Sequence, residues 1–260
     1  MNNLLVESRT LPIFGLNVSL YGIMIALAML LGIVCALFIC KVKSYNINMP
    51  INLALYALPF AIVGARIYYC IFNGVDSFIS IFQIWKGGMA IYGGVIGGFL
   101  GVLLCCKIHK YSLLHACDVA APCLILGQAI GRIGCYFAGC CYGVETQIEW
   151  LQAFPLSVYI NGAWHLSTFF YESFLDLLGF GLLIFITSKS ISRGVVTSSY
   201  FIIYGTIRAV LEQFRDGAET LMLGSIRVSQ LLSVLLVILG FSMLFVIFYK
   251  KEKDKVWNSK

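Results

Sequence analysis

Long apolar stretches make up most of this chain, and short polar or basic segments separate them. A stretch of roughly 20 apolar residues is long enough to cross about 30 Å of hydrocarbon as an α-helix. Seven such stretches can be placed, with approximate ends at residues 18–40, 51–72, 88–106, 113–134, 166–188, 195–214 and 228–249. The pattern predicts an all-α, polytopic membrane protein with about seven transmembrane helices, which form a single transmembrane domain over residues 1–260.

The composition supports a membrane protein and argues against a soluble one. Apolar residues account for 60% of the chain, charged residues for only 12%, and the mean hydropathy is +0.90. A soluble domain carries about 25% charged residues, so it could not hide this much apolar surface. The formal net charge is +6, but the Lys and Arg residues stand between apolar stretches, whereas a nucleic-acid binder gathers them on one face.

The basic residues predict the orientation, because positively charged loops stay in the cytoplasm. One side holds eleven of them, namely Lys41, Lys43, Lys107, Lys110, Lys189, Arg193, Lys250, Lys251, Lys253, Lys255 and Lys260. The other side holds four, namely Arg9, Lys86, Arg215 and Arg227. We therefore expect the N-terminus outside and the C-terminus in the cytoplasm. The first 17 residues lack the basic start and apolar core of a cleavable signal peptide.

Seven charged residues fall within the predicted spans or at their ends. They are Arg66, Asp118, Arg132, Glu172, Asp176, Arg208 and Glu212. A charge at membrane depth costs at least about 2.5 to 3.5 kcal/mol, so each should face protein or water and have a partner. The group predicts a polar interior cavity and favours an enzyme that acts on lipid at the outer membrane face.

Spacing places three polar side chains on one face of the sixth span. Tyr204, Arg208 and Glu212 follow one another at intervals of four residues, and Arg215 comes three residues later. Residues four apart are neighbours on a helix surface. This stripe fits a functional site, and it fits equally well a structural Arg208–Glu212 pair that holds helices together.

A glycine-rich run opens the third span. One row at four-residue intervals consists of Gly93, Gly97 and Gly101, and a second consists of Gly94 and Gly98. Such rows are typical of helices whose backbones approach closely. Packing does not account for Gly87 and Gly88, whose backbone N–H groups at the expected helix start are suited to an anion.

The longest segment between spans covers about 135–165 and is expected outside. It follows the run GlyArgIleGlyCysTyrPheAlaGlyCysCysTyrGly at 131–143. The glycines beside Arg132 predict a broken helix end that holds the guanidinium near the outer head groups. An anionic phosphate is the expected ligand there.

Six motifs, taken together and in order, resemble the bacterial prolipoprotein diacylglyceryl transferases. They are Tyr-Gly at 21–22, Gly-Ala-Arg at 64–66, Gly-Gly-x-x-x-Tyr-Gly-Gly at 87–94, Gly-Arg-x-Gly at 131–134, Tyr-Glu at 171–172 and Tyr-Gly-x-x-Arg-x-x-x-Glu at 204–212. Each motif alone is weak, but the ordered set extends over nearly the whole chain and is specific.

The resemblance implies an enzyme of the bacterial cytoplasmic membrane that needs no cofactor, metal or nucleic acid. Its substrates would be phosphatidylglycerol and preprolipoprotein signal peptides, and the diacylglyceryl group would move to the lipobox Cys thiol with release of glycerol phosphate. The implied catalytic residues are Tyr92, Arg132, Arg208 and Glu212. The implied substrate-binding residues are Tyr21, Arg66, Gly93, Gly94, Gly131, Gly134, Glu172 and Tyr204. Arg132 and Arg208 would stabilise the departing phosphate, and Glu212 would orient Arg208.

This chain departs from the family pattern in two places. Tyr92 stands where many members have His, and Cys135, Ala138 and Cys140 stand where the outer motif usually has two Asn and a Glu. A phenol has a reference pKa near 10, so Tyr92 is a base at neutral pH only if Arg lowers its pKa. Otherwise it donates a hydrogen bond to the lipid head group. The general base and the choice between main transferase and diverged paralogue both stay open.

The ten cysteines fall into two groups. Seven lie in or near apolar spans and are expected to act as small apolar residues, namely Cys35, Cys40, Cys70, Cys105, Cys106, Cys117 and Cys123. Cys135, Cys140 and Cys141 cluster on the outer side, where three thiols can bind metal or form disulfides. No His or fourth Cys stands nearby to complete a typical zinc set, so a structural or redox-inert role is expected.

Two functions from other classes compete with lipid transfer. An outward-facing thiol oxidoreductase would explain the adjacent cysteines but not the polar stripe of the sixth span. A small-molecule transporter would explain the intramembrane charges, but such proteins usually contain internal repeats, and neither glycine-rich motif has a second copy here.

Overall fold

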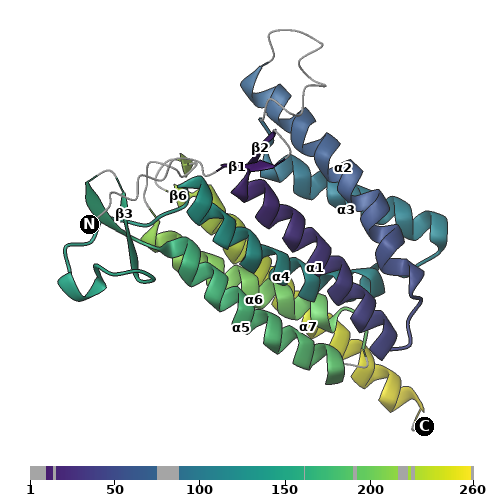
Figure 1. Ribbon diagram of the computed structural model, residues 1–260. Coiled ribbons are helices and arrows are strands. Elements are labelled where there is room, and N and C mark those ends of the chain that lie inside the picture. Colours follow the sequence, from purple (N-terminus) through teal and green to yellow (C-terminus); the bar gives the residue numbers. More distant parts are fainter. Residues whose placement is uncertain are drawn as a thin grey trace. The chain divides into compact units, whose positions relative to one another are not determined.

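The computed structural model describes residues 10–13, 16–74, 88–160, 162–189, 192–215, 222–223 and 226–258 (Figure 1). In these ranges the α-helices are α1 (Leu20–Val42), α2 (Asn48–Asn73), α3 (Ile91–His109), α4 (Leu113–Ala138), α5 (Thr168–Lys189), α6 (Val195–Leu211) and α7 (Val228–Asn258). Antiparallel hairpins pair β1 (Thr10–Ile13) with β2 (Leu16–Ser19), β3 (Ser157–Ile160) with β4 (Ala163–Leu166), and β5 (Met222–Leu223) with β6 (Ile226–Arg227). Single 3-10 turns form η3 (Glu149–Leu151) and η4 (Glu212–Phe214).

Helices α1 to α5 and α7 are long and apolar enough to cross a membrane. Large apolar side chains on them, such as Phe38, Ile71 and Phe245, are exposed, as expected of surfaces that face lipid. The predicted all-α, polytopic class is therefore confirmed. Helix α6 has 17 residues, or about 26 Å at the usual rise, which is at the short end of the range for a transmembrane helix. The predicted span 195–214 is thus divided between this helix and η4.

The prediction of a broken helix end beside Arg132 was wrong. Helix α4 continues to Ala138, so Arg132 lies inside a regular helix rather than at a broken end, and Cys135 belongs to the helix. The helix stops because Gly139 adopts a left-handed conformation with φ of 65° and the Cys140 N–H donates to the Cys135 carbonyl at 3.2 Å. This is the hydrogen-bond pattern of a Schellman C-cap. The segment between α4 and α5 therefore covers residues 139–167.

The third span starts close to its approximate predicted boundary, but Gly88 does not open the helix. Helix α3 begins at Ile91, three residues after Gly88, which has φ of 75°. The N–H of Gly88 therefore does not belong to the first helical turn, where an anion site was expected. Gly87 lies outside the described residues, as do Arg9, Lys86 and Lys260 of the charge pattern.

The chain divides into two compact units, one of residues 36–120 and one of residues 1–35 with 121–260. In the first unit, α2 packs against α3 along the predicted glycine row. A Cβ atom at Gly97 would lie 2.2 Å from the Phe60 carbonyl oxygen, and one at Gly93 would lie 2.3 Å from the Gly64 oxygen. Close backbone packing is therefore confirmed for this row. The expectation of a single transmembrane domain stays a prediction.

We expect Gly97→Ala to destabilise this helix pair by about 1–3 kcal/mol, because the added methyl group would overlap backbone. The matched control is Gly98→Ala, where the new Cβ would meet the Ala61 Cβ at 3.5 Å, an ordinary contact. Thermal unfolding in detergent should show a lower Tm for the first variant only. Equal Tm values for the two variants would contradict this packing.

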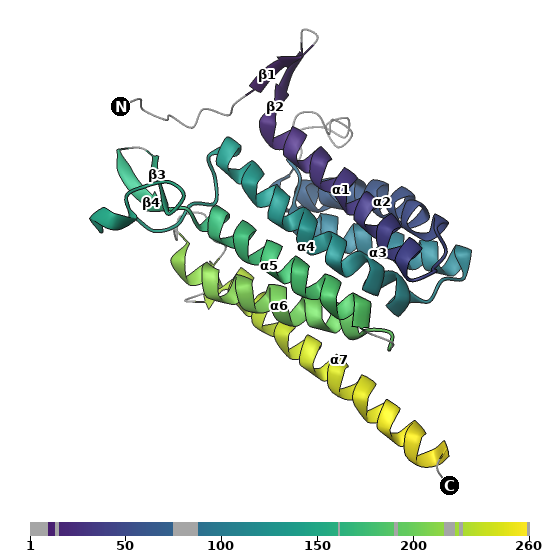
Figure 2. The ribbon, with the colours of Figure 1, turned by 60° about the horizontal axis from the view of Figure 1, so that its bottom comes forward.

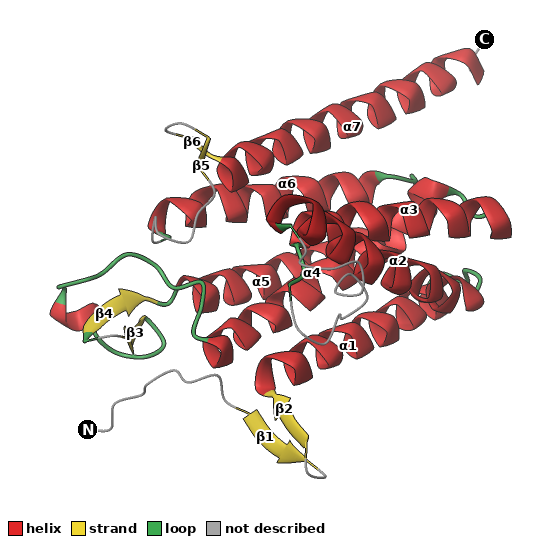
Figure 3. Ribbon diagram, turned by 90° about the horizontal axis from the view of Figure 1, so that it is seen from above, coloured by secondary structure: helices red, strands yellow, loops and turns green. Residues whose placement is uncertain are grey.

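In the second unit, α6 packs between α5 and α7, as Figures 1 and 2 show. Its core includes Ile125, Leu183 and Tyr200 from three different helices. Figure 3 places the hairpins β3–β4 and β5–β6 at one end of these helices, where α6 ends and where α5 and α7 begin. Glu172 near the start of α5 and Arg208 near the end of α6 lie toward this end.

Candidate active site

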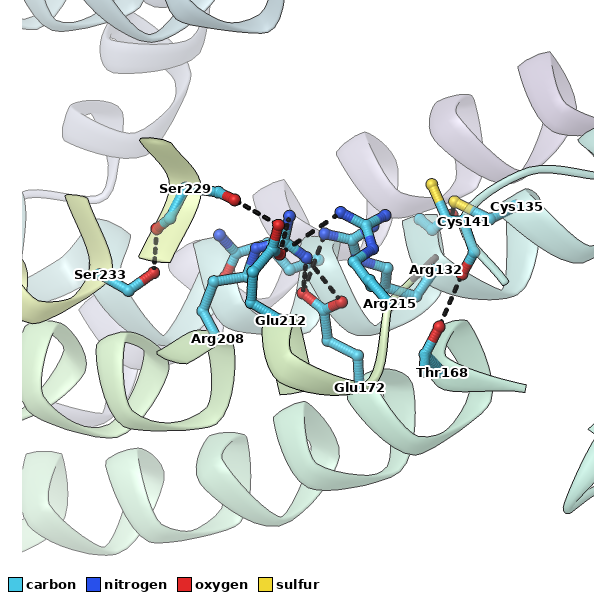
Figure 4. Close-up of polar contacts among 12 residues, drawn as sticks. Arg132, Cys135, Cys141, Thr168, Glu172, Arg208, Glu212, Arg215, Ser229 and Ser233 are labelled. Atoms are coloured by element: carbon cyan, nitrogen blue, oxygen red, sulfur yellow. Dashed lines mark hydrogen bonds and ion pairs between the residues drawn. The ribbon is translucent and has the colours of Figure 1, made fainter. Parts of the chain in front are cut away.

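Five charged side chains form an alternating chain, the charge cluster, in the second unit. Each side chain forms an ion pair with the next in the order Arg132, Glu172, Arg208, Glu212 and Arg215 (Figure 4). The first lies in α4 and the last directly follows η4. Successive N···O distances are 2.8 Å, 3.0 Å, 3.2 Å and 3.7 Å. Each carboxylate therefore lies between two guanidinium groups.

Arg208 joins the two halves of the cluster. Its Nη1 donates to both carboxylate oxygens of Glu172, at 3.0 Å and 3.3 Å, and its Nη2 pairs with Glu212 one helical turn away. The predicted Arg208–Glu212 contact is thus confirmed. The convergence of Arg132 and Arg208 on Glu172 could not be read from spacing, because the three residues come from α4, α6 and α5.

The acidic side chains of the charge cluster are more deeply buried than the basic ones. The side chains of Glu172 and Glu212 are 3% and 1% exposed, whereas Arg132, Arg208 and Arg215 are 18%, 14% and 14% exposed. Three guanidinium groups against two carboxylates leave one net positive charge. An arriving anion therefore meets guanidinium N–H groups, and each guanidinium offers five donors.

Two further contacts to Glu212 come from the end of β6 and the start of α7. The Ser229 hydroxyl donates to Glu212 Oε1, and the Arg227 guanidinium donates to the Glu212 backbone oxygen. From the sequence, Arg227 was predicted only as a basic residue outside the spans, and Ser229 was not predicted to have a role. The motif order offered no signal for either contact, because both depend on how α6 and α7 pack.

Four further predicted residues belong to the same unit, one at the start of α1, two in α4 and one in α6. The ring of Tyr21, at the start of α1, packs against Gly134, where a Cβ would lie 3.1 Å from the ring. Gly131 has ordinary space around it, with Ile25 at 3.6 Å. Tyr204 stacks on Tyr200 at 5.7 Å, so packing accounts for part of its surroundings.

The remaining predicted residues belong to the unit of residues 36–120, namely Arg66, Tyr92, Gly93 and Gly94. Arg66 is buried, donates from Nη1 to the Gly88 oxygen at 2.9 Å and lies over the Tyr69 ring. Tyr92 is half-buried, and its ring centroid lies 6.3 Å from that of Tyr68. Gly93 serves the helix packing already described, whereas Gly94 makes only ordinary contact with Ala65.

A compact thiol cluster is formed by Cys135, Cys140 and Cys141, whose sulfur atoms all lie within 4.8 Å of one another. Hydrogen bonds from the other two thiols, helped by the charges of Arg215 and Arg132, lower the pKa of the Cys141 thiol. Sulfur contacts among the three raise the pKa of Cys140 instead. One thiol of the cluster is thus favoured as the thiolate.

Contacts of the following loop hold this cluster in place. Thr168 at the start of α5 donates to the Cys141 oxygen at 2.8 Å. The Val144 N–H donates to the Phe214 oxygen at 2.9 Å, next to Arg215. Gly143 permits this approach, because a Cβ there would lie 2.5 Å from the Phe214 oxygen. The loop therefore joins the thiol cluster to the end of α6 that carries the arginines.

Apolar helices thus carry a cluster in which three guanidinium groups are held by two buried carboxylates. The sequence model of the prolipoprotein diacylglyceryl transferases matches residues 9–246. The chain belongs to this family.

Curated relatives agree with the family match over nearly their whole length. A phosphatidylglycerol–prolipoprotein diacylglyceryl transferase of Clostridium botulinum strain Langeland is 39% identical over 246 residues, which cover 92% of this chain and 96% of the relative. The protein of the same name from Clostridium kluyveri is 38% identical over 249 residues, which cover 93% and 96% of the two chains.

Proposed function

We propose that this chain transfers a diacylglyceryl group from phosphatidylglycerol to the lipobox Cys thiol of preprolipoproteins, forming a thioether and releasing glycerol phosphate. The observation that carries the proposal is the sharing of Glu172 by Arg132 and Arg208, in a partly exposed cluster with net positive charge. The family and the printed names of the relatives support this reaction over thiol oxidation or transport.

The chemistry requires positive charge where the phosphate leaves. As the bond from carbon to the phosphate oxygen breaks, negative charge grows on the phosphate, and guanidinium groups already in place stabilise it. Guanidinium forks match phosphate geometry, so each arginine can contact two oxygens. Glu172 and Glu212 keep the forks in position before the substrate arrives.

Glu212 is proposed to orient Arg208 rather than to act as the base. Its carboxylate already pairs with Arg208 and accepts from Ser229. The acceptor thiol must lose a proton, because the thiolate is the nucleophile. Tyr92 stays a proposed participant, either as a base or as a hydrogen-bond donor to the lipid head group.

The membrane orientation is proposed from the charge pattern, with the N-terminus outside and the C-terminus inside the bacterial cytoplasmic membrane. The segment that includes Glu149 would then lie outside. A reporter fused after Lys260 should read as cytoplasmic, and a tag beside Glu149 should be labelled by a reagent that does not cross the membrane. The reverse pattern would refute this orientation.

The transfer itself is tested with purified protein in vesicles of phosphatidylglycerol labelled in its acyl chains. Label should appear on a peptide that carries a lipobox Cys and not on the same peptide with Ser in its place. If the Cys peptide stays unlabelled and is instead trapped on the protein as a mixed disulfide, the chain is a thiol oxidoreductase and the proposal fails.

A further inference from the structure

We propose that the thiol cluster of Cys135, Cys140 and Cys141 binds a zinc ion, and that the fourth coordination position of this ion takes up the acceptor thiol. The second half rests on the proposed function, whereas the first half stands on the geometry of the three sulfur atoms alone. The site lies in the same unit as the charge cluster.

The geometry of the thiols is close to that of a zinc site. Zinc–sulfur bonds of about 2.3 Å at tetrahedral angles place two sulfur ligands about 3.8 Å apart. The three sulfur atoms already lie within 4.8 Å of one another, so no pair needs to close by more than about 1 Å. The left-handed turn at Gly139 produces this arrangement, because it folds Cys140 and Cys141 back onto the last turn of α4.

The number and type of ligands favour zinc with an open position. Catalytic zinc sites have three protein ligands and one exchangeable position, while structural sites have four. Thiolates are soft ligands that select zinc or copper(I) among common biological metals. Three thiolates around Zn²⁺ carry one negative charge, and the guanidinium groups of Arg132 and Arg215 stand beside the cluster to offset it (Figure 4).

A zinc ion here would activate the acceptor thiol as the nucleophile. This chain lacks the acid and amide residues that its family usually has in the motif that contains Arg132. A thiol that coordinates zinc is deprotonated outright, and its proton passes to water. The sulfur then attacks the diacylglyceryl carbon that carries the phosphate. The S–C bond forms as the C–O bond breaks, and the bonding electron pair leaves with the phosphate oxygen as glycerol phosphate.

The test begins with metal analysis of the full-length protein, purified in detergent under reducing conditions without chelator. We expect one zinc per chain in the wild type and loss of the ion in Cys135→Ser, Cys140→Ser and Cys141→Ser. The matched control is Cys70→Ser in α2, which should keep its zinc. A well-folded wild type without zinc, or one that binds copper instead, overturns the proposal, whatever the folding of the variants.

The open position is tested by cobalt substitution. The Co²⁺ protein should show thiolate charge-transfer bands, and a lipobox Cys peptide should shift its visible absorption while the Ser peptide does not. Zinc binding without this shift overturns the role in thiol uptake. The transfer assay is read separately, so transfer by a metal-free protein refutes the role of zinc in thiol uptake and leaves the proposed function intact.

Discussion

Replacing Arg132 or Arg208 with Gln is expected to lower the rate of diacylglyceryl transfer by about 100-fold or more. Both guanidinium groups contact Glu172 and are partly exposed toward the site. Gln keeps a polar group that donates hydrogen bonds, but it is shorter and removes the charge that stabilises the departing phosphate. The loss should appear in kcat, because the interaction strengthens as the C–O bond breaks.

The matched control is Arg193→Gln, which removes an exposed guanidinium in the turn between α5 and α6. It should leave the rate nearly unchanged. The transfer rate of Glu212→Gln should lie between that of Arg193→Gln and that of the Arg132 and Arg208 variants. This substitution loosens Arg208 without removing its charge. Near-normal transfer by either cluster variant would remove that arginine from the site, and a folded but inactive Glu212→Gln would make Glu212 the leading candidate for the base.

The second large effect is expected for Glu172→Gln. This carboxylate is 3% exposed and lies between Arg132 and Arg208, so its neutralisation leaves two guanidinium groups without their shared partner. Breaking a buried ion pair in this way typically costs about 3–5 kcal/mol. We expect a clear decrease in Tm together with slower transfer.

Glu149→Gln is the control for this variant, because Glu149 is exposed in η3. Its Tm should match that of the wild type. An unchanged Tm for Glu172→Gln would show that the two arginines are held by other contacts, and the assignment of Glu172 as their anchor would then be wrong.

The sequence predicted the helices well because the membrane allows few alternatives. Backbone groups in hydrocarbon must be satisfied within the segment, so an apolar stretch of sufficient length forms a helix. The boundary of α4 was missed because Gly131 and Gly134 suggested a break, whereas Gly139 ends the helix with its left-handed conformation. A helix tolerates glycine inside it when a neighbour such as Tyr21 packs there.

Contacts within one helix could also be predicted, whereas contacts between helices could not. Arg208 and Glu212 are one turn apart, so their pairing follows from helical geometry. The role of Glu172 depends on how α5 packs against α4 and α6, which no local spacing encodes. The thiol cluster was predicted in part: sequence proximity placed Cys135, Cys140 and Cys141 together, but the close approach of their sulfur atoms depends on the turn after α4.

The most direct test of the central claim is the mass of the acceptor peptide after reaction, measured together with the glycerol phosphate released. Purified wild-type protein with phosphatidylglycerol should give a peptide heavier by one diacylglyceryl group on its Cys, and one glycerol phosphate for each modified peptide. Arg132→Gln should reduce both products in parallel. An unmodified peptide with a folded wild-type protein, or a modified peptide formed without glycerol phosphate, would contradict the account.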